Sequence, residues 1–146
     1  MTKTLTILFL FITLYATAQR NHRERIKTLK VSFITERLDL TAKEAEKFWP
    51  VYNEYEDKMH TVRAKDIKGI RREIKNNMDT MSQDRAQELI TELNKAESTM
   101  HELRIGLTKN LSQIISPKKI ILLKVAEEDF KRKMLNEFKR RQKERG

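Results

Sequence analysis

The 146-residue sequence contains no cysteine, two prolines and three glycines. Without cysteine the chain has no disulfide, no thiol nucleophile and no cysteine for lipid attachment. Because turn-forming residues are scarce, the elements between turns must be few and long. Aromatic residues make up 7% of the chain and charged residues 36%, which is typical of long helices rather than of a sheet. We therefore predict an all-α fold that is stabilised by helix packing or by association.

The first 18 residues resemble a secretory signal peptide. Lys3 precedes the apolar run LTILFLFITLYA, and Ala16-Thr17-Ala18 fits the small-x-small cleavage pattern. The run is short for a membrane span, although an uncleaved anchor is the alternative. We predict cleavage after Ala18, localisation in the periplasm, and a single domain over residues 19–146 that ends in a basic tail.

Apolar residues at helical spacing predict four helices in the remaining chain. A short helix over residues 21–38 is followed by two long ones over 41–78 and 82–114, and a last one begins after Ser116-Pro117. Thr41 and Glu44 form a capping-box pattern, Ser82 can cap the third helix, and Pro117 suits a first helical position. The short connection between the long helices predicts an antiparallel hairpin, with the C-terminal helix packed on it.

Large rings surround a proline in the second predicted helix. Pro50 lies nine residues after the predicted cap, where it is expected to kink the helix. Phe48, Trp49, Tyr52 and Tyr55 flank this position. One interpretation places these rings in the core, and the other places Trp49 or a tyrosine at the edge of a concave surface that binds client proteins.

Basic residues are concentrated at both ends of the mature chain. The whole sequence carries a formal charge of +10, with six basic and two acidic residues over 20–37 and eight and two over 131–145. In a cytoplasmic protein this excess would suggest nucleic acid, but the export signal argues against that partner. The basic ends are either ordinary solvated surface or a positive surface that attracts acidic or unfolded chains.

One phrase occurs twice. Residues 40–59 align without a gap on residues 115–134, and both copies read as an apolar residue, a hydroxyl cap and a helix. The first copy contributes Leu40, Thr41 and Glu44, and the second Ile115, Ser116 and Lys119. These phrases resemble the repeated Leu-Thr-x-x-Gln motif of the Spy/CpxP family, and both depart from it at the final residue. The continuation FWPVYNEY, residues 48–55, is similar to relatives from Bacteroidetes that are often labelled sensors of ECF-type sigma factors.

The resemblance covers essentially the whole mature chain and implies a helical hairpin with a fourth helix packed back on it, commonly in an antiparallel, cradle-shaped homodimer. It also implies either ATP-independent chaperone activity or a role in envelope-stress or metal sensing. Our leading hypothesis is a periplasmic binding protein that holds unfolded or stress-released envelope proteins on a basic concave helical surface. The alternative is a regulator that acts on a membrane-bound sensor or an anti-sigma factor, either without metal or in response to metal, as the resemblance to metal-sensing relatives implies.

No pattern in the chain indicates catalysis. A Gly-rich phosphate loop and a His-Glu-x-x-His phrase are both missing from the sequence. We predict a non-enzyme without catalytic residues or cofactors. His60 and His101 are weak metal candidates, because hairpin pairing would place them at similar heights near acidic residues, and the alternative is two solvated surface histidines.

Overall fold

The computed structural model describes residues 24–144, which are helical almost throughout. A helical segment over 24–38 is followed by α2 (Ala42–Thr61), a π-helical segment η1 (Val62–Ile67), α3 (Lys68–Asn77), a 3-10 turn η2 (Met78–Thr80), α4 (Gln83–Leu111) and α5 (Pro117–Lys143). No strand occurs within residues 24–144. The all-α prediction is confirmed, whereas the predicted signal peptide and its cleavage site lie outside the described residues.

The chain divides into two compact units, which are described separately. The hairpin unit comprises residues 41–120, and the terminal unit comprises residues 1–40 and 121–146. Helix α5 begins in the hairpin unit and continues in the terminal unit, where it includes most of the basic C-terminal segment.

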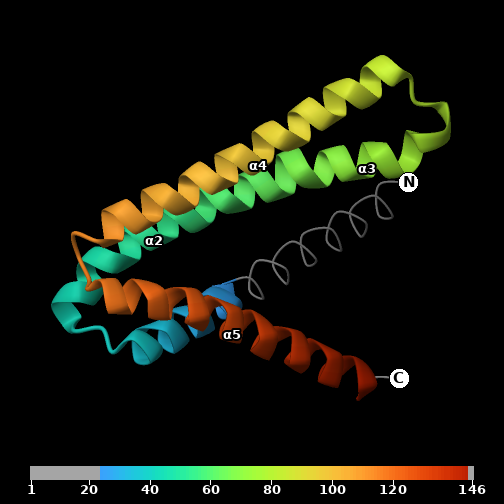
Figure 1. Cartoon of the computed structure of the whole chain (residues 1–146). Coiled ribbons are helices and arrows are strands. Elements are labelled where there is room, and N and C mark those ends of the chain that lie inside the picture. The colour runs from blue at the N-terminus through green and yellow to red at the C-terminus, as the bar shows by residue number, and fades with distance from the viewer. Residues whose placement is uncertain (1–23, 145–146) are drawn as a thin grey trace, which may run out of the picture. The chain divides into compact units, whose positions relative to one another are not determined.

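The hairpin unit is built on two antiparallel helical rods (Figure 1). Helices α2, η1 and α3 follow one another without a break, and α4 returns alongside them and contacts all three. The predicted antiparallel hairpin is confirmed. Its buried side chains repeat at helical spacing along each rod: Phe48, Tyr52, Met59, Val62 and Ile70 on one, and Leu89, Ala96 and Leu111 on the other.

Three predicted caps stand at the starts of three helices. The Thr41 hydroxyl accepts a hydrogen bond from the Glu44 amide at 3.2 Å, and the Thr41 amide donates to the Glu44 carboxylate at 2.9 Å. The Ser82 hydroxyl accepts from the Arg85 amide at 3.1 Å, and that of Ser116 accepts from the Lys119 amide at 3.4 Å. Each hydroxyl satisfies an amide that has no partner inside its helix, which is why these helices begin where they do.

Pro50 lies inside α2 and does not end it. The departure from α geometry comes later, in η1, where the Lys68 amide donates to the carbonyl of Arg63, five residues earlier. A π-helical turn contains one residue more than an α-helical turn and shifts the buried stripe of the following helix. In the sequence the stripe steps from Val62 to Ile70, an interval of eight residues where two α-helical turns span about seven.

The described part of the terminal unit pairs the 24–38 segment with α5. The rings of Phe33 and Phe130 lie 5.6 Å apart between centroids, and Arg37 forms an ion pair with Asp129 at 3.5 Å. The segment ends where Asp39 adopts a positive φ of 47°. The amides of Asp39 and Leu40 then donate to the carbonyls of Glu36 and Thr35, the Schellman pattern that closes a helix.

Several residues of the predicted apolar stripes are exposed rather than buried. Ile90 is 51% exposed, Met78 is 61% exposed and Phe138 is 60% exposed. A helix with a single close neighbour buries a narrow face, so residues at the margin of a broad stripe remain in water. Phe138 lies at the margin of a groove in the terminal unit.

Candidate binding groove

The terminal unit contains a groove of about 290 Å³ between the 24–38 segment and α5. On each helix, residues at helical spacing lie on the face that lines the groove. Its apolar lining is formed by Ile26, Leu29, Phe33, Phe130, Met134 and Phe138, and its charged lining by Arg25, Lys133, Glu137 and Arg141.

The apolar lining continues from a packed base to exposed side chains. Phe130 is buried, and its ring meets that of Phe33 at 47° in a tilted contact. Leu29 is 46% exposed and Phe138 is 60% exposed. Large apolar side chains that gather in a concave site gain free energy when a partner covers them. The groove can therefore accept an apolar segment of another chain.

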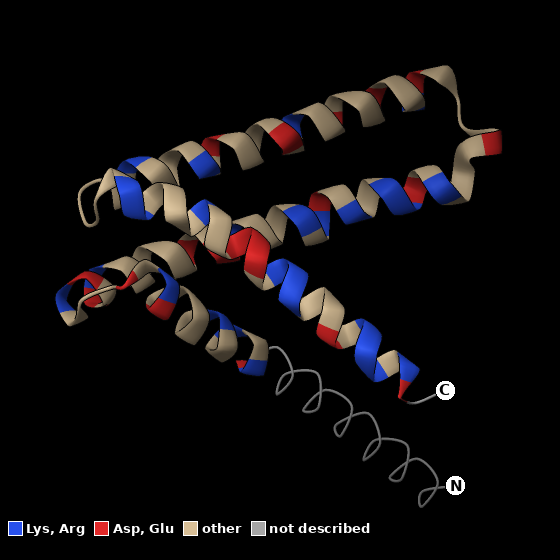
Figure 2. Cartoon of the chain, turned by 60° about the horizontal axis from the view of Figure 1, so that its bottom comes forward, with Lys and Arg blue, Asp and Glu red and all other residues tan. Residues whose placement is uncertain are grey.

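Positive charge surrounds these apolar residues. The Lys133 ammonium lies 5.5 Å from the centroid of the Phe33 ring. Arg140 donates a hydrogen bond of 2.9 Å to Glu137, and this bond, with the charges of Arg140, Arg141 and Lys133, lowers the pKa of the Glu137 carboxyl. Lys and Arg residues, coloured blue, recur along the C-terminal half of α5 (Figure 2). An apolar segment with acidic flanks matches this lining best.

The aromatic residues singled out in the sequence divide between core and surface. Phe48 and Tyr52 are 0% and 1% exposed, and their rings stack with centroids 5.4 Å apart. Trp49 and Tyr55 are partly exposed. The Trp49 ring lies edge-on to Phe48 at 4.9 Å and to Tyr52 at 5.6 Å. Phe48 and Tyr52 are thus core residues, and Trp49 and Tyr55 are the rings that another molecule could reach.

The two copies of the repeated phrase meet through the fifth residue of each, Glu44 in the first and Lys119 in the second. The Lys119 ammonium donates to the Glu44 carboxylate at 2.8 Å, and the same carboxylate oxygen accepts from the Thr41 amide. These bonds, that of Lys119 first, lower the pKa of Glu44. Of the remaining motif residues, Ile115 is buried, Leu40 is partly exposed, and Thr41 and Ser116 are exposed caps. The arrangement joins the starts of α2 and α5.

The histidine pair has no ligand cluster around it. His60 and His101 are both exposed, on α2 and α4. Lys58 and Glu102 are close in sequence to His60 and His101, and both line one hollow of the hairpin unit. The two histidines therefore lie at similar heights along the two antiparallel rods. Over residues 24–144, however, no three His, Asp or Glu side chains are grouped as metal ligands.

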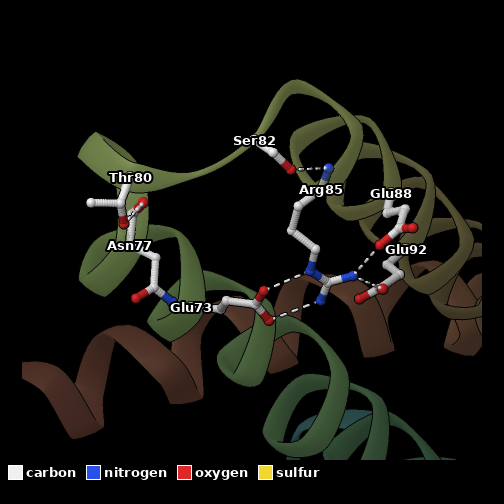
Figure 3. Close-up of polar contacts among 7 residues, drawn as sticks. All are labelled: Glu73, Asn77, Thr80, Ser82, Arg85, Glu88 and Glu92. Carbon is white, nitrogen blue, oxygen red and sulfur yellow. Dashed lines mark hydrogen bonds and ion pairs between the residues drawn. The ribbon is translucent and has the colours of Figure 1, made fainter.

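A cluster of one arginine and three glutamates near the tip of the hairpin was not predicted from the sequence (Figure 3). The Arg85 guanidinium binds both carboxylate oxygens of Glu73, at 2.7 and 2.9 Å. It also donates to Glu88 at 2.8 Å and to Glu92 at 3.0 Å. These hydrogen bonds, led by that to Glu73, raise the pKa of Arg85. Counting residues on either side of the predicted turn would have placed Glu73 and Arg85 opposite each other.

The groove itself was also missed. The sequence signal was the coincidence of two apolar stripes, one that includes Phe33 and one that includes Phe130, with the two basic ends of the chain.

None of the helices in the described part of the chain is long and apolar enough to cross a membrane. Comparison with models of known protein families, with curated proteins and with solved structures gives no match for this chain.

Proposed function

We propose that this chain is an exported, non-enzymatic binding protein that holds unfolded or stress-released envelope proteins without ATP. The observation that carries the proposal is the groove of the terminal unit, where exposed Leu29 and Phe138 lie among Arg25, Lys133 and Arg141. The predicted export signal places the client proteins in the periplasm, and the resemblance of the repeated phrase to the Spy/CpxP family supports the same role.

The chemistry of the groove suits reversible holding. Unfolded proteins expose apolar side chains, and each 100 Å² of apolar surface that the groove covers contributes about 2.5 kcal/mol. Basic side chains at the groove attract acidic segments and increase the rate of encounter, an effect that salt screens over about 10 Å. Contacts of this kind form and release without nucleotide hydrolysis.

The proposal is tested by suppression of aggregation of a denatured model protein by residues 19–146. We expect suppression that weakens as salt is added and that falls severalfold in the Leu29→Gln/Phe138→Gln variant. The matched control is Ile90→Gln/Ile105→Gln, which replaces two apolar residues that are 51% and 55% exposed on α4. Equal aggregation with and without the protein, or an equal loss in both variants, would overturn the proposal.

Crosslinking from the groove separates this function from regulation. A photoreactive residue in place of Phe138 should capture many unrelated envelope proteins if the chain holds unfolded clients. Capture of a single membrane protein in stoichiometric amounts would instead support a regulator that acts on a membrane-bound sensor or an anti-sigma factor.

A further inference from the structure

One face of α5 is exposed along its whole course in the terminal unit. From Ile121 to Lys143, a length of about 33 Å, eleven exposed residues fall within about 140° of the helix circumference. Every buried or partly buried residue of the same stretch lies outside this arc, including the groove residues Phe130 and Met134. We call the exposed arc the α5 outer face, and it consists of Ile121, Lys124, Val125, Glu128, Lys131, Arg132, Leu135, Asn136, Lys139, Gln142 and Lys143.

Apolar side chains recur along the α5 outer face. Ile121 is 67% exposed, Val125 is 46% exposed and Leu135 is 51% exposed. At about 100° per residue these three lie within about 80° of one another around the helix. Apolar side chains on one side of a straight helix can all leave water together when a flat apolar phase covers them. The face therefore offers apolar contact to a single flat surface.

Positive charge accompanies these apolar residues. The exposed lysines of the α5 outer face are Lys124, Lys131, Lys139 and Lys143. Arg132 is compensated, because its guanidinium binds the Asp129 carboxylate at 2.7 Å on the same helix. Glu128 is the one carboxylate among the eleven residues of the face, so the four lysines leave an excess of three positive charges. A lysine can lay its aliphatic stem on an apolar surface while its ammonium remains with water or anions.

Exposed apolar residues alone do not distinguish α5 from the hairpin. On α4, Ile90 is 51% exposed and Ile105 is 55% exposed. The sequence of α4, however, contains five acidic and four basic residues, so these isoleucines lie on a helix with no positive excess. A negative surface is therefore complementary to the α5 outer face and not to α4.

We propose that the α5 outer face binds the surface of an anionic lipid bilayer, with the helix lying in the plane of the membrane. Ile121, Val125 and Leu135 enter the boundary between head groups and acyl chains, and the lysine ammonium groups bind lipid phosphates. An acidic protein would have to place carboxylates in register with the lysines along about 33 Å of helix, whereas a bilayer presents phosphates at every position. This inference does not depend on the proposed function, since the groove lies outside the arc and no client is involved.

Sedimentation with vesicles tests the proposal on residues 19–146, which omit the predicted signal peptide because its apolar run would itself bind lipid. We expect binding to phosphatidylcholine vesicles that contain phosphatidylglycerol, no binding to pure phosphatidylcholine, and a weaker affinity as salt is added.

Lys131→Gln/Lys139→Gln should weaken binding to the anionic vesicles at least about tenfold, since each lysine near such a surface strengthens binding about fivefold. The matched control is Lys95→Gln/Lys109→Gln, which removes two exposed lysines from α4 and should bind as the native chain does. Failure to bind anionic vesicles, equal binding to both kinds of vesicle, or an equal loss in both variants would overturn the proposal.

Because the chain has no native cysteine, a single dye can report which face enters the lipid. A polarity-sensitive dye on Leu135→Cys should shift its emission to the blue when anionic vesicles are added, and the same dye on Ile105→Cys should not. Equal shifts at both positions would mean that no particular face contacts lipid, and would overturn the proposal. Circular dichroism checks that each variant keeps its helices.

Heparin separates a lipid surface from a soluble polyanion, because it carries negative charge without acyl chains. If the dye on Leu135→Cys is unchanged by vesicles and heparin binds as strongly as they do, the α5 outer face is a general polyanion site and the lipid proposal fails. A blue shift with vesicles that heparin does not reproduce would support insertion of Leu135 into the bilayer.

Discussion

Lys119 and Glu44, 75 residues apart in the sequence, meet at 2.8 Å between ammonium and carboxylate at the starts of two helices. The Lys119 ammonium lies in the first turn of α5, where the partial positive charge of the helix start repels a cation. Glu44 lies in the first turn of α2, where a carboxylate is favoured, and it compensates the charge of Lys119. The repeated phrase thus yields two capped helix starts joined by opposite charges at equivalent positions.

The Glu44 carboxyl should titrate at a higher pH when Lys119 is removed. Lys119→Met eliminates the hydrogen bond that contributes most to the lowered pKa of Glu44, so the pKa should move up toward its ordinary value. Carbon NMR of the Glu44 carboxyl over an acid titration measures the change directly. Lys118→Met removes an exposed lysine from the same turn and serves as the control.

The sign of the linkage follows from the direction of the shift. A pKa lowered by folding contributes stability above the ordinary carboxyl pKa, and that contribution is lost as pH falls through the lowered value. The melting temperature of the native chain should therefore fall more steeply below about pH 4 than that of Lys119→Met, given the usual Glu pKa of about 4.3. Identical acid profiles for the two proteins would contradict a role for this ion pair in the folded state.

The helix starts could be predicted because their determinants are local. Thr41, Ser82 and Ser116 each act on an amide three residues away, so the hydroxyl and its partner are adjacent in the sequence. The contact of Glu44 with Lys119 was not predicted, although the two residues occupy equivalent positions in the aligned phrases. Alignment of two sequence segments gives no information on their distance in space. The path of the chain after α4 determines that distance.

The π-helical segment and the exposure of Ile90 were missed for another reason. Both depend on how a stripe of side chains fits one particular neighbouring helix, whereas hydrophobic periodicity reports only that a stripe exists. The groove of the terminal unit lies in the same category, since its two walls are about a hundred residues apart in the sequence.

Arg85→Lys should loosen the tip of the hairpin. Lysine can reach one carboxylate oxygen at a time and cannot reproduce the two parallel bonds of Arg85 to Glu73. Hydrogen exchange of backbone amides in α3 and in the first turns of α4 should speed up, with less change near Leu111. Arg104→Lys alters an exposed arginine of α4 and should leave exchange as it is. Unchanged protection in Arg85→Lys would mean that the apolar contacts alone hold the tip.

Phe48→Ala and Trp49→Ala should differ in cost although the residues are adjacent. Phe48 is 0% exposed, and truncation of a buried aromatic ring costs about 3–5 kcal/mol of the free energy of unfolding. Trp49 is partly exposed and contacts Phe48 and Tyr52 through its edge, so its loss should cost about half as much, with little cavity left behind. Urea denaturation followed by circular dichroism measures both.

The relative stability of Phe48→Ala and Trp49→Ala also indicates whether Trp49 is available to other molecules. If Trp49→Ala proves as destabilising as Phe48→Ala, the indole belongs to the core and no client can reach it. If Trp49→Ala keeps most of the stability, acrylamide quenching of the native protein should reach this residue, which is the only tryptophan in the chain. Addition of an unfolded client should then change the quenching only if the client covers α2 beside Pro50, and groove variants such as Leu29→Gln separate that site from the terminal unit.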